Sequence, residues 1–135
     1  MQISLNTPVG ATPRVWAGRV LSGLVIAFLL LDSALKLLDL VVVQQTMAQL
    51  GYPTHLDRTI GVITLVGVTL YAVPRTSVLG AVWLTGLFGG AIATHVRVES
   101  PLFSHVLFGV YLGLLVWGGL YLRDARLRAL FPLRA

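Results

Sequence analysis

The sequence contains no cysteine and very little charge. Without cysteine it has no disulfide, no thiolate metal ligand, no cysteine nucleophile and no dithiol redox pair. Only 11% of the residues are charged and 56% are hydrophobic, whereas a typical soluble domain is about 25% charged. So few charged groups cannot cover the surface of a water-soluble protein. The chain is therefore predicted to lie in a lipid bilayer.

Signatures of several enzyme classes are also missing. The sequence has no glycine-rich phosphate loop, dinucleotide-binding fingerprint or nucleophile elbow. The net charge of +5 comes from basic residues that flank apolar runs, which is typical of topology signals rather than of nucleic-acid binding. We expect no nucleic-acid partner. If the protein takes part in redox chemistry, the electrons must reside on a bound cofactor or on a partner.

Four apolar runs are candidates for membrane-spanning helices. Such a helix needs about 20 residues to cross about 30 Å of hydrocarbon. The fourth run is the most regular, and the second is short unless it begins near Thr54. The first run contains Arg19, Asp32 and Lys36, and no small-residue cleavage site closes it, so we expect it to be retained. The spans that the runs predict lie at about residues 15–38, 56–73, 77–95 and 102–122.

An amphipathic segment lies between the first two spans, at about residues 40–50. Its apolar residues recur at spacings of three and four, and glutamines fill the other positions, which predicts an interfacial helix. The predicted fold class is all-α. Residues 1–135 form one membrane domain, a four-transmembrane-helix bundle with this short helix and a basic C-terminal tail at 123–135.

Basic residues fall unequally on the two sides of a four-span topology. The side with both termini and Arg75 carries seven of them, and the other side carries Lys36, Arg58 and Arg97. Basic residues are enriched in cytoplasmic loops. Both termini are therefore predicted to be cytoplasmic, with membrane lipids around the spans and anionic lipid at the basic tail.

Two glycine pairs have the spacing that lets membrane helices approach closely. Gly86 and Gly90 lie on the third run, and Gly109 and Gly113 lie on the fourth. We expect these pairs to pack within one chain. The alternative is that one of these faces forms a homo-oligomer.

Several polar residues lie within or beside the predicted spans, where a central charge costs at least about 2.5–3.5 kcal/mol. Asp32 and Lys36 have the acid-first spacing that favours an ion pair. His105 shares a helix face with Gly109 and Gly113, so we expect it to point into the bundle. Carboxylates and imidazoles in such a place can move protons or hold the oxygens of a lipophilic ligand. The predicted ligand-binding residues are Asp32, Ser33, Lys36, Thr94, His95, Arg97 and His105.

Blander interpretations stay open for these residues. Lys36 and Asp39 can extend to the membrane interface, and Arg97 and Glu99 can belong to a solvated loop. No tight ligand spacing indicates a metal site, and none is predicted. If the protein is an enzyme, the candidate catalytic residues are Asp32, Lys36, His95 and His105.

Several short segments resemble the DoxX-like family of small bacterial membrane proteins. They are Ser33-x-x-Lys36, Leu50-Gly51-Tyr52-Pro53, Pro74-Arg75, Leu79-Gly80-Ala81 and the run from Gly89 to Arg97. The resemblance spans roughly Arg19 to Leu122 and implies a four-helix bundle in the bacterial cytoplasmic membrane. It implies Lys36, His95 and Arg97 as the family's polar positions. Better-studied relatives include a small subunit of a thiosulfate:quinone oxidoreductase and proteins linked to oxidative-stress complexes.

The leading functional hypothesis is an accessory subunit of a membrane redox system. It would bind a quinone or another lipophilic small molecule and serve a redox-protein partner. One alternative is a cofactor-free isomerase or hydrolase of hydrophobic substrates, with a histidine as base and Asp32 as acid. Another is a structural component that self-assembles through its glycine faces.

Overall fold

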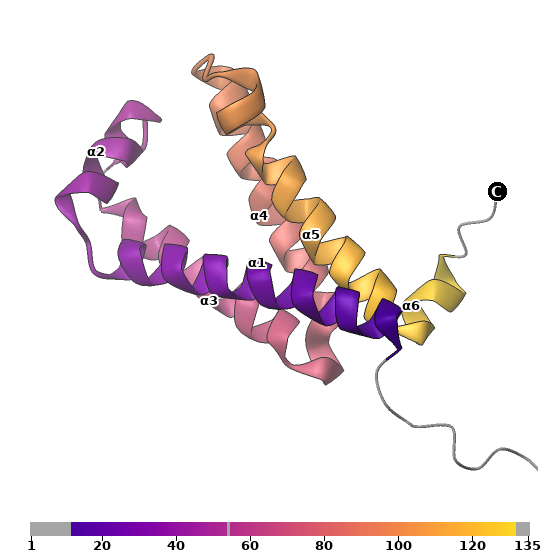
Figure 1. The fold of residues 1–135 in the computed structure, drawn as a ribbon. Coiled ribbons are helices and arrows are strands. Elements are labelled where there is room, and N and C mark those ends of the chain that lie inside the picture. Colours follow the sequence, from indigo (N-terminus) through magenta and orange to yellow (C-terminus); the bar gives the residue numbers. More distant parts are fainter. Residues whose placement is uncertain (1–11, 54, 132–135) are drawn as a thin grey trace, which may run out of the picture.

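The structure is a computed structural model that describes residues 12–53 and 55–131, and every regular element among them is helical (Figure 1). The all-α prediction is confirmed. Residues 1–11, Thr54 and the last part of the basic tail lie outside the described residues. The long helices are α1 (Pro13–Leu37), α3 (Leu56–Ala72), α4 (Ser77–Arg97) and α5 (Phe108–Arg123). The short elements are α2 (Val41–Gln49), a 3₁₀ turn (Pro74–Thr76), a π-helical turn (Leu102–Val106) and α6 (Ala125–Leu130).

Three of the four predicted spans have the length and composition to cross a membrane: Pro13–Leu37, Pro74–Arg97 and Leu102–Arg123. The remaining long helix, α3, has 17 residues. It rises only about 25 Å, less than the about 30 Å of a hydrocarbon core. The helix begins at Leu56, so Pro53 and His55 add no length to it.

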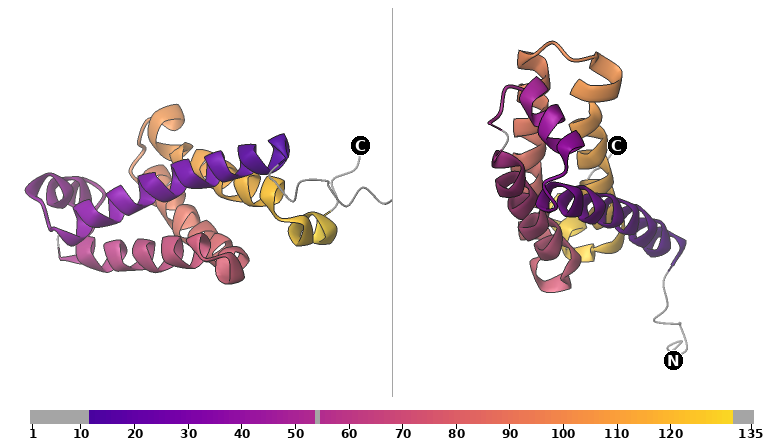
Figure 2. Two further views of the ribbon diagram at one scale, coloured as in Figure 1. Left: turned by 60° about the horizontal axis from the view of Figure 1, so that its bottom comes forward. Right: turned by 90° about the vertical axis from the view of Figure 1, so that its left-hand side faces the viewer.

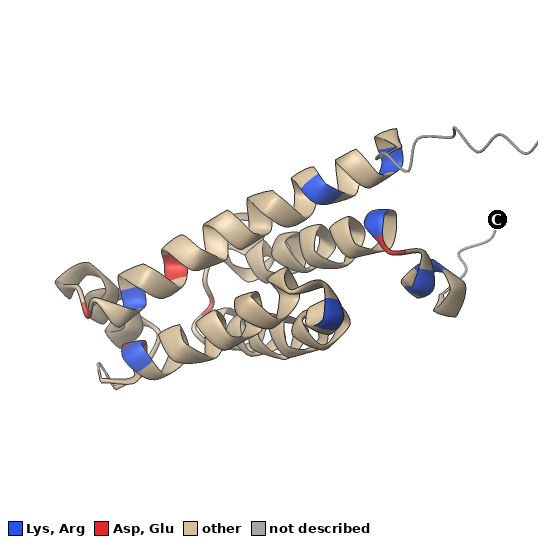
Figure 3. Ribbon diagram, turned by 90° about the horizontal axis from the view of Figure 1, so that it is seen from below, with Lys and Arg blue, Asp and Glu red and all other residues tan. Residues whose placement is uncertain are grey.

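The long helices pack in a ring in the order α1, α3, α4, α5 and back to α1. Figure 1 and Figure 2 show α4 and α5 leaving α1 and α3 at an angle. The helices therefore meet where α1 begins and α5 ends, and they lie apart where α2 is found. We call these two regions the closed end and the open end. Charged residues gather toward the helix ends and leave most of the helix length uncharged (Figure 3).

Glycines bring the helix backbones together at the closed end. A Cβ on Gly18 of α1 would lie 2.7 Å from the carbonyl oxygen of Gly119 on α5, and a Cβ on Gly119 would lie 2.5 Å from Ser22 Oγ. A Cβ on Gly80 of α4 would overlap the backbone of Tyr71 at the end of α3. Only hydrogen at these positions allows such close crossings.

A chain of hydrogen bonds joins three helices at the same end. Tyr71 is fully buried, and its hydroxyl donates to the carbonyl of Val116 at 2.6 Å. That hydroxyl also lies 2.8 Å from Ser22 Oγ, which accepts from Arg123 Nε at 3.0 Å. The Arg123 guanidinium lies 5.3 Å from the centre of the Tyr71 ring. These bonds satisfy polar groups that the surrounding apolar side chains could not.

Most of the glycines that we expected to pack within the chain do not. Gly109 is the exception, since a Cβ there would meet the side chain of Ile92 on α4 at 2.8 Å. A Cβ on Gly86, Gly90 or Gly113 would meet nothing within 4 Å. The spacing correctly marks small faces, but no helix among the described residues lies against these three.

Candidate functional site

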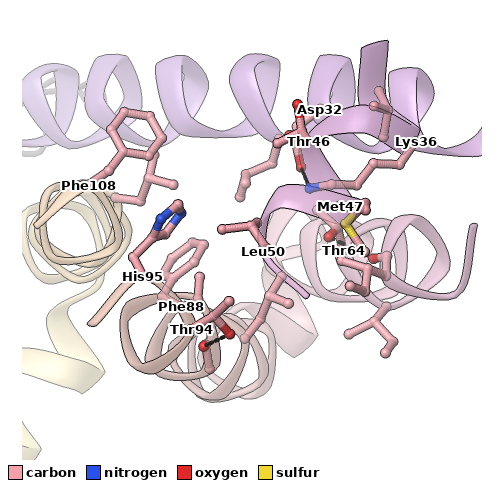
Figure 4. A pocket seen from close by; sticks show the side chains of 18 of the residues that line it. Asp32, Lys36, Thr46, Met47, Leu50, Thr64, Phe88, Thr94, His95 and Phe108 are labelled. Atoms are coloured by element: carbon pink, nitrogen blue, oxygen red, sulfur yellow. Dashed lines mark hydrogen bonds and ion pairs between the residues drawn. The ribbon is translucent and has the colours of Figure 1, made fainter. Parts of the chain in front are cut away.

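A cavity of about 780 Å³ lies at the open end, between α1, α2, α3, α4 and the start of α5 (Figure 4). This volume falls within the range of about 300–1,000 Å³ that is usual for small-molecule sites. The lining is mostly apolar. The missing side chains of Gly86 and Gly90 leave the α4 backbone as part of the wall.

One wall of the cavity carries an ion pair. Lys36 Nζ donates to Asp32 Oδ2 at 2.6 Å, one helical turn apart on α1. This confirms the ion pair that the spacing predicted. The two side chains are partly exposed, at 22% for Lys36 and 32% for Asp32. The ammonium has three N–H donors, and one of them bonds to the Asp32 carboxylate, so the others can donate to a ligand.

Another part of the lining carries two imidazoles, those of His95, labelled in Figure 4, and His105. The rings of His95 and His105 stack edge to face with centroids 5.6 Å apart. His95 Nδ1 lies 2.9 Å from Ser100 Oγ, and His105 Nδ1 lies 2.7 Å from Ser104 Oγ. Neither Nε2 has a hydrogen-bond partner among the described residues.

His105 reaches this wall because the chain enters α5 through a π-helical turn. The amides of His105 and Val106 both donate to the carbonyl of Pro101, and the amide of Leu107 donates to that of Leu102. Such wide turns are rare in proteins overall, but those that occur are often found at functional sites. The predicted span at 102–122 is thus helical throughout but is not a uniform α-helix.

Helix α2 forms a third wall and is held at both ends. Near its C-terminal end, Arg97 Nη2 donates to the carbonyl of Leu50 at 2.6 Å, and the Tyr52 hydroxyl lies 2.8 Å from Thr94 Oγ1. At its N-terminal end, Gln44 Nε2 donates to Asp39 Oδ1 at 2.9 Å. Within α2, Met47 is 4% exposed and lines the cavity.

The structure places the predicted ligand-binding residues in two groups. The residues that line the cavity are Asp32, Lys36, Thr94, His95 and His105. Ser33 does not, because it is buried with its hydroxyl donating to the carbonyl of Leu30. Arg97 is exposed and serves to fasten α2. Ligand binding by these residues stays a prediction.

Sequence reasoning missed the aromatic part of the lining. Phe28 on α1 and Phe108 on α5 meet edge to face at 5.4 Å, and Phe88 on α4 also lines the cavity. A signal was present, because Phe28 lies one turn before Asp32 and Phe108 lies one turn after His105. Aromatic rings beside polar groups are typical of sites for planar lipophilic ligands.

Metal binding finds no support in the described part of the chain. Within residues 12–53 and 55–131, no three or more His, Cys, Asp or Glu side chains gather as a metal would require. The cavity offers a salt bridge, two imidazoles and hydroxyls for polar contacts, and carbon for the rest.

Apolar helices with charges at their ends, arranged around a mostly apolar cavity, define an α-helical integral membrane protein. The model of the DoxX-like family matches residues 20–119. The chain therefore belongs to the DoxX-like family, and the resemblance seen in the sequence is confirmed. The match covers every residue that lines the cavity. No curated protein and no solved structure matches the chain.

Proposed function

We propose that this protein binds a quinone, or another lipophilic small molecule with polar groups at two sides, in the open-end cavity. The cavity supports the proposal, because its volume of about 780 Å³ can hold a small molecule, its lining is mostly apolar, and Lys36 and the two histidines can donate to a ligand. A quinone ring bears two carbonyl oxygens on opposite sides. One would accept from Lys36 Nζ and the other from an imidazole Nε2–H of His95 or His105, with the ring against the α4 backbone at Gly90.

We further propose that the protein serves a membrane redox system as an accessory subunit. The chain has no cysteine, and its described part has no cluster of metal ligands. A bound quinone would therefore exchange electrons with a partner protein rather than with a centre in this chain. The redox partner is expected to contact the open end, where the cavity lies.

The proposed topology has four spans in the bacterial cytoplasmic membrane, with both termini in the cytoplasm. Helix α3 is the short one, but it packs between α1 and α4, which both have the length to span. Tilted neighbours and local thinning of the bilayer accommodate a short helix at modest cost. The excess of arginine at the closed end supports a cytoplasmic position for that end.

Quinone retention by matched glycine variants tests the proposed function. Neither Gly90 nor Gly113 has a neighbour within 4 Å of an added Cβ, but only Gly90 lines the cavity. Any ligand that stays bound to protein purified from native membranes is extracted and identified. A short-chain benzoquinone is then titrated into the reconstituted protein. We expect Gly90→Leu to weaken binding by about tenfold or more, which corresponds to about 1.4 kcal/mol, and Gly113→Leu to bind as the wild type does.

A second matched pair tests the polar wall. Lys36→Met removes the donor inside the cavity, and Arg75→Met removes an exposed cation outside it. Weaker binding in the Lys36 variant alone supports the proposal. Protein that leaves native membranes without a ligand, and that binds the benzoquinone equally in all four variants, contradicts it.

The enzyme alternative gains no support from the geometry. Both histidines bond through Nδ1 to serines and Asp32 bonds to Lys36, so no hydrogen bond joins a histidine to Asp32 among the described residues. The self-assembly alternative keeps one supporting observation, the open space at Gly113 on α5. The Gly113→Leu variant also tests it, because loss of an oligomer in gentle detergent would place that face at a subunit contact.

A further inference from the structure

A buried carboxyl group near the cavity is left without a full set of partners. Asp57 lies in the first turn of α3 and is completely buried. Its Oδ1 accepts from the amide of Arg58 at 2.6 Å. Its Oδ2 is buried and has no hydrogen-bond donor among the described residues. An ionised oxygen in that position would be costly, because nothing replaces the water it has lost.

A second carboxyl group, that of Asp39, lies beside Asp57. Asp39 follows the end of α1 in the left-handed region, with φ of 56°, and its side chain lies within hydrogen-bonding reach of Asp57. Two carboxylate oxygens cannot bond to each other without a proton. The hydrogen bond from Asp57, together with that from Gln44, lowers the pKa of Asp39. Asp39 already accepts from Gln44 and faces Arg58, whereas Asp57 Oδ2 is buried without a donor, so a proton shared by the pair belongs on Asp57.

We propose that Asp57 and Asp39 form a proton-binding site that fastens the start of α2, with protonated Asp57 donating to the Asp39 carboxylate. The proton satisfies the orphaned oxygen and removes the repulsion between two negative charges. One side chain passes the effect to α2. Gln44 Nε2 donates to both the backbone carbonyl and the carboxylate of Asp39, at 3.2 Å and 2.9 Å.

The charged groups around the pair favour a proton over a metal cation. Arg58 Nη2 lies 3.6 Å from Asp39 Oδ2, so a positive charge already faces the acceptor. On α1, Lys36 lies one turn deeper and is paired with Asp32. Residues 41–49 of α2 contain no titratable side chain. The remaining titratable groups near this end are the exposed His55 before α3 and Arg97 of α4, which bonds to Leu50.

Loss of the proton leaves two carboxylates face to face. The O–H bond of Asp57 breaks, the proton passes to solvent, and the pair then carries two negative charges, with Arg58 as the one cation that faces it among the described residues. Repulsion moves Asp39 away from Asp57 and takes Gln44 with it. Thr46 and Met47 of α2 line the cavity, so the cavity changes shape with the proton. A consequence for ligand entry rests on the proposed function, whereas the proton site itself does not.

Infrared spectroscopy of the full chain in lipid nanodiscs tests the proton directly. At neutral pH the wild type should show the C=O band of a protonated carboxyl group. Asp57→Asn should lose this band, and Asp32→Asn, which changes a carboxylate in a different ion pair, should keep it. Absence of the band in the wild type, or its persistence in Asp57→Asn, overturns the proposal. A band that sodium chloride abolishes at constant pH also overturns it, because a cation then competes for the site.

The absence of cysteine makes the link to α2 measurable. A spin label on Gln45→Cys, an exposed position of α2, is then unique in the protein, and Ala129→Cys on α6 supplies a control label at the closed end. Mobility at position 45 should rise as the carboxyl band disappears with increasing pH, while position 129 stays unchanged. In the Asp57→Asn background the amide N–H takes the place of the proton, so the label should stay immobile over the same range.

An unchanged pH response of the label in Asp57→Asn overturns the coupling. If that variant does not fold, Asp39→Asn carries the test. In this variant no negative charge faces Asp57, so the band of its protonated carboxyl group should vanish at a pH about one unit or more below that at which it vanishes in the wild type. An unshifted band in Asp39→Asn contradicts the pairing. Quinone titration at the two pH extremes distinguishes this result from the proposed function, because the band does not depend on a ligand.

Discussion

The closed and open ends of this protein use glycine in opposite ways. At the closed end, Gly18, Gly80 and Gly119 each lie against the backbone of a neighbouring helix. At the open end, Gly86 and Gly90 line the cavity, and a Cβ on either would meet nothing within 4 Å. Glycine therefore allows close contact between helices at the closed end, whereas at the open end it leaves the space of the cavity unfilled.

The difference separates two tasks in one small chain. The closed end holds the helices through backbone contact and a buried hydrogen-bond chain, neither of which tolerates added volume. The open end is fastened through side chains at the two ends of α2, which can be released singly. Glycine spacing alone does not distinguish the two tasks, because what lies opposite the glycine decides its role.

The largest effect that would test this comparison is expected from one methyl group at each end. Gly80→Ala should destabilise the protein by about 3 kcal/mol, since the methyl meets the backbone of Tyr71 and neither helix can yield easily. Gly90→Ala should change the free energy of unfolding by less than about 0.5 kcal/mol. Reversible denaturation in mixed micelles measures both. Equal losses at the two positions would remove the distinction between the ends.

A single hydroxyl at the closed end should have the next largest effect. Tyr71→Phe leaves the carbonyl of Val116 and the hydroxyl of Ser22 without their buried partner, at a cost of about 1–3 kcal/mol. Tyr111→Phe is the matched control, because its hydroxyl donates to the carbonyl of Phe103 at an exposed position. The control should unfold nearly as the wild type does. A loss in Tyr111→Phe as large as that in Tyr71→Phe would contradict this prediction.

At the open end, cutting one fastening of α2 should loosen only that helix. Arg97→Gln removes the bond to the carbonyl of Leu50, and we expect the global free energy of unfolding to fall by less than about 1 kcal/mol. Amide hydrogen exchange should accelerate in α2 and stay unchanged in α5. Arg126→Gln, at an exposed site on α6, should leave both rates alone. Acceleration throughout the chain would show that the two ends unfold together.

The smallest effect is expected from acid. The pKa of Asp39 lies below its usual value of 3.8 because Asp57 and Gln44 donate to its carboxylate. The stabilisation of the folded state by the ionised Asp39 carboxylate is therefore complete above about pH 4, and it is lost as the pH falls through the lowered pKa. Hydrogen exchange in α2 should accelerate in that acidic range, and Asp39→Asn should abolish this dependence. An identical acid response in wild type and variant would refute it.

The local features of this fold follow from the sequence with little loss. The apolar runs and the glutamines of α2 give helices because their periodicity repeats every three to four residues, and the Asp32–Lys36 pair needs only one turn of one helix. The cavity lining follows in part for the same reason, since His105 and Phe108 share a face of the chain.

Contacts between distant segments could not be predicted in this way. Gly18 meets Gly119 across a separation of about a hundred residues, and Arg97 reaches back to Leu50. A helical repeat does not specify which helix lies opposite, so the expected packing of the Gly86 and Gly90 face against another helix of the chain was wrong. Asp57 was missed because one acid in a first turn is usual at helix starts, and only the fold brings Asp39 to it.

The two left-handed residues that flank α2 have a kinetic consequence. Asp39 and Gly51, with φ of 56° and 83°, mark sharp bends at which the chain enters and leaves this short helix. Swinging the segment outward breaks a few hydrogen bonds near its ends and leaves the distant helix crossings untouched. Such a local opening needs far less free energy than global unfolding. The residence time of a bound molecule would then be governed by the opening rate of the segment from Asp39 to Gly51, which is separate from the rate of global unfolding.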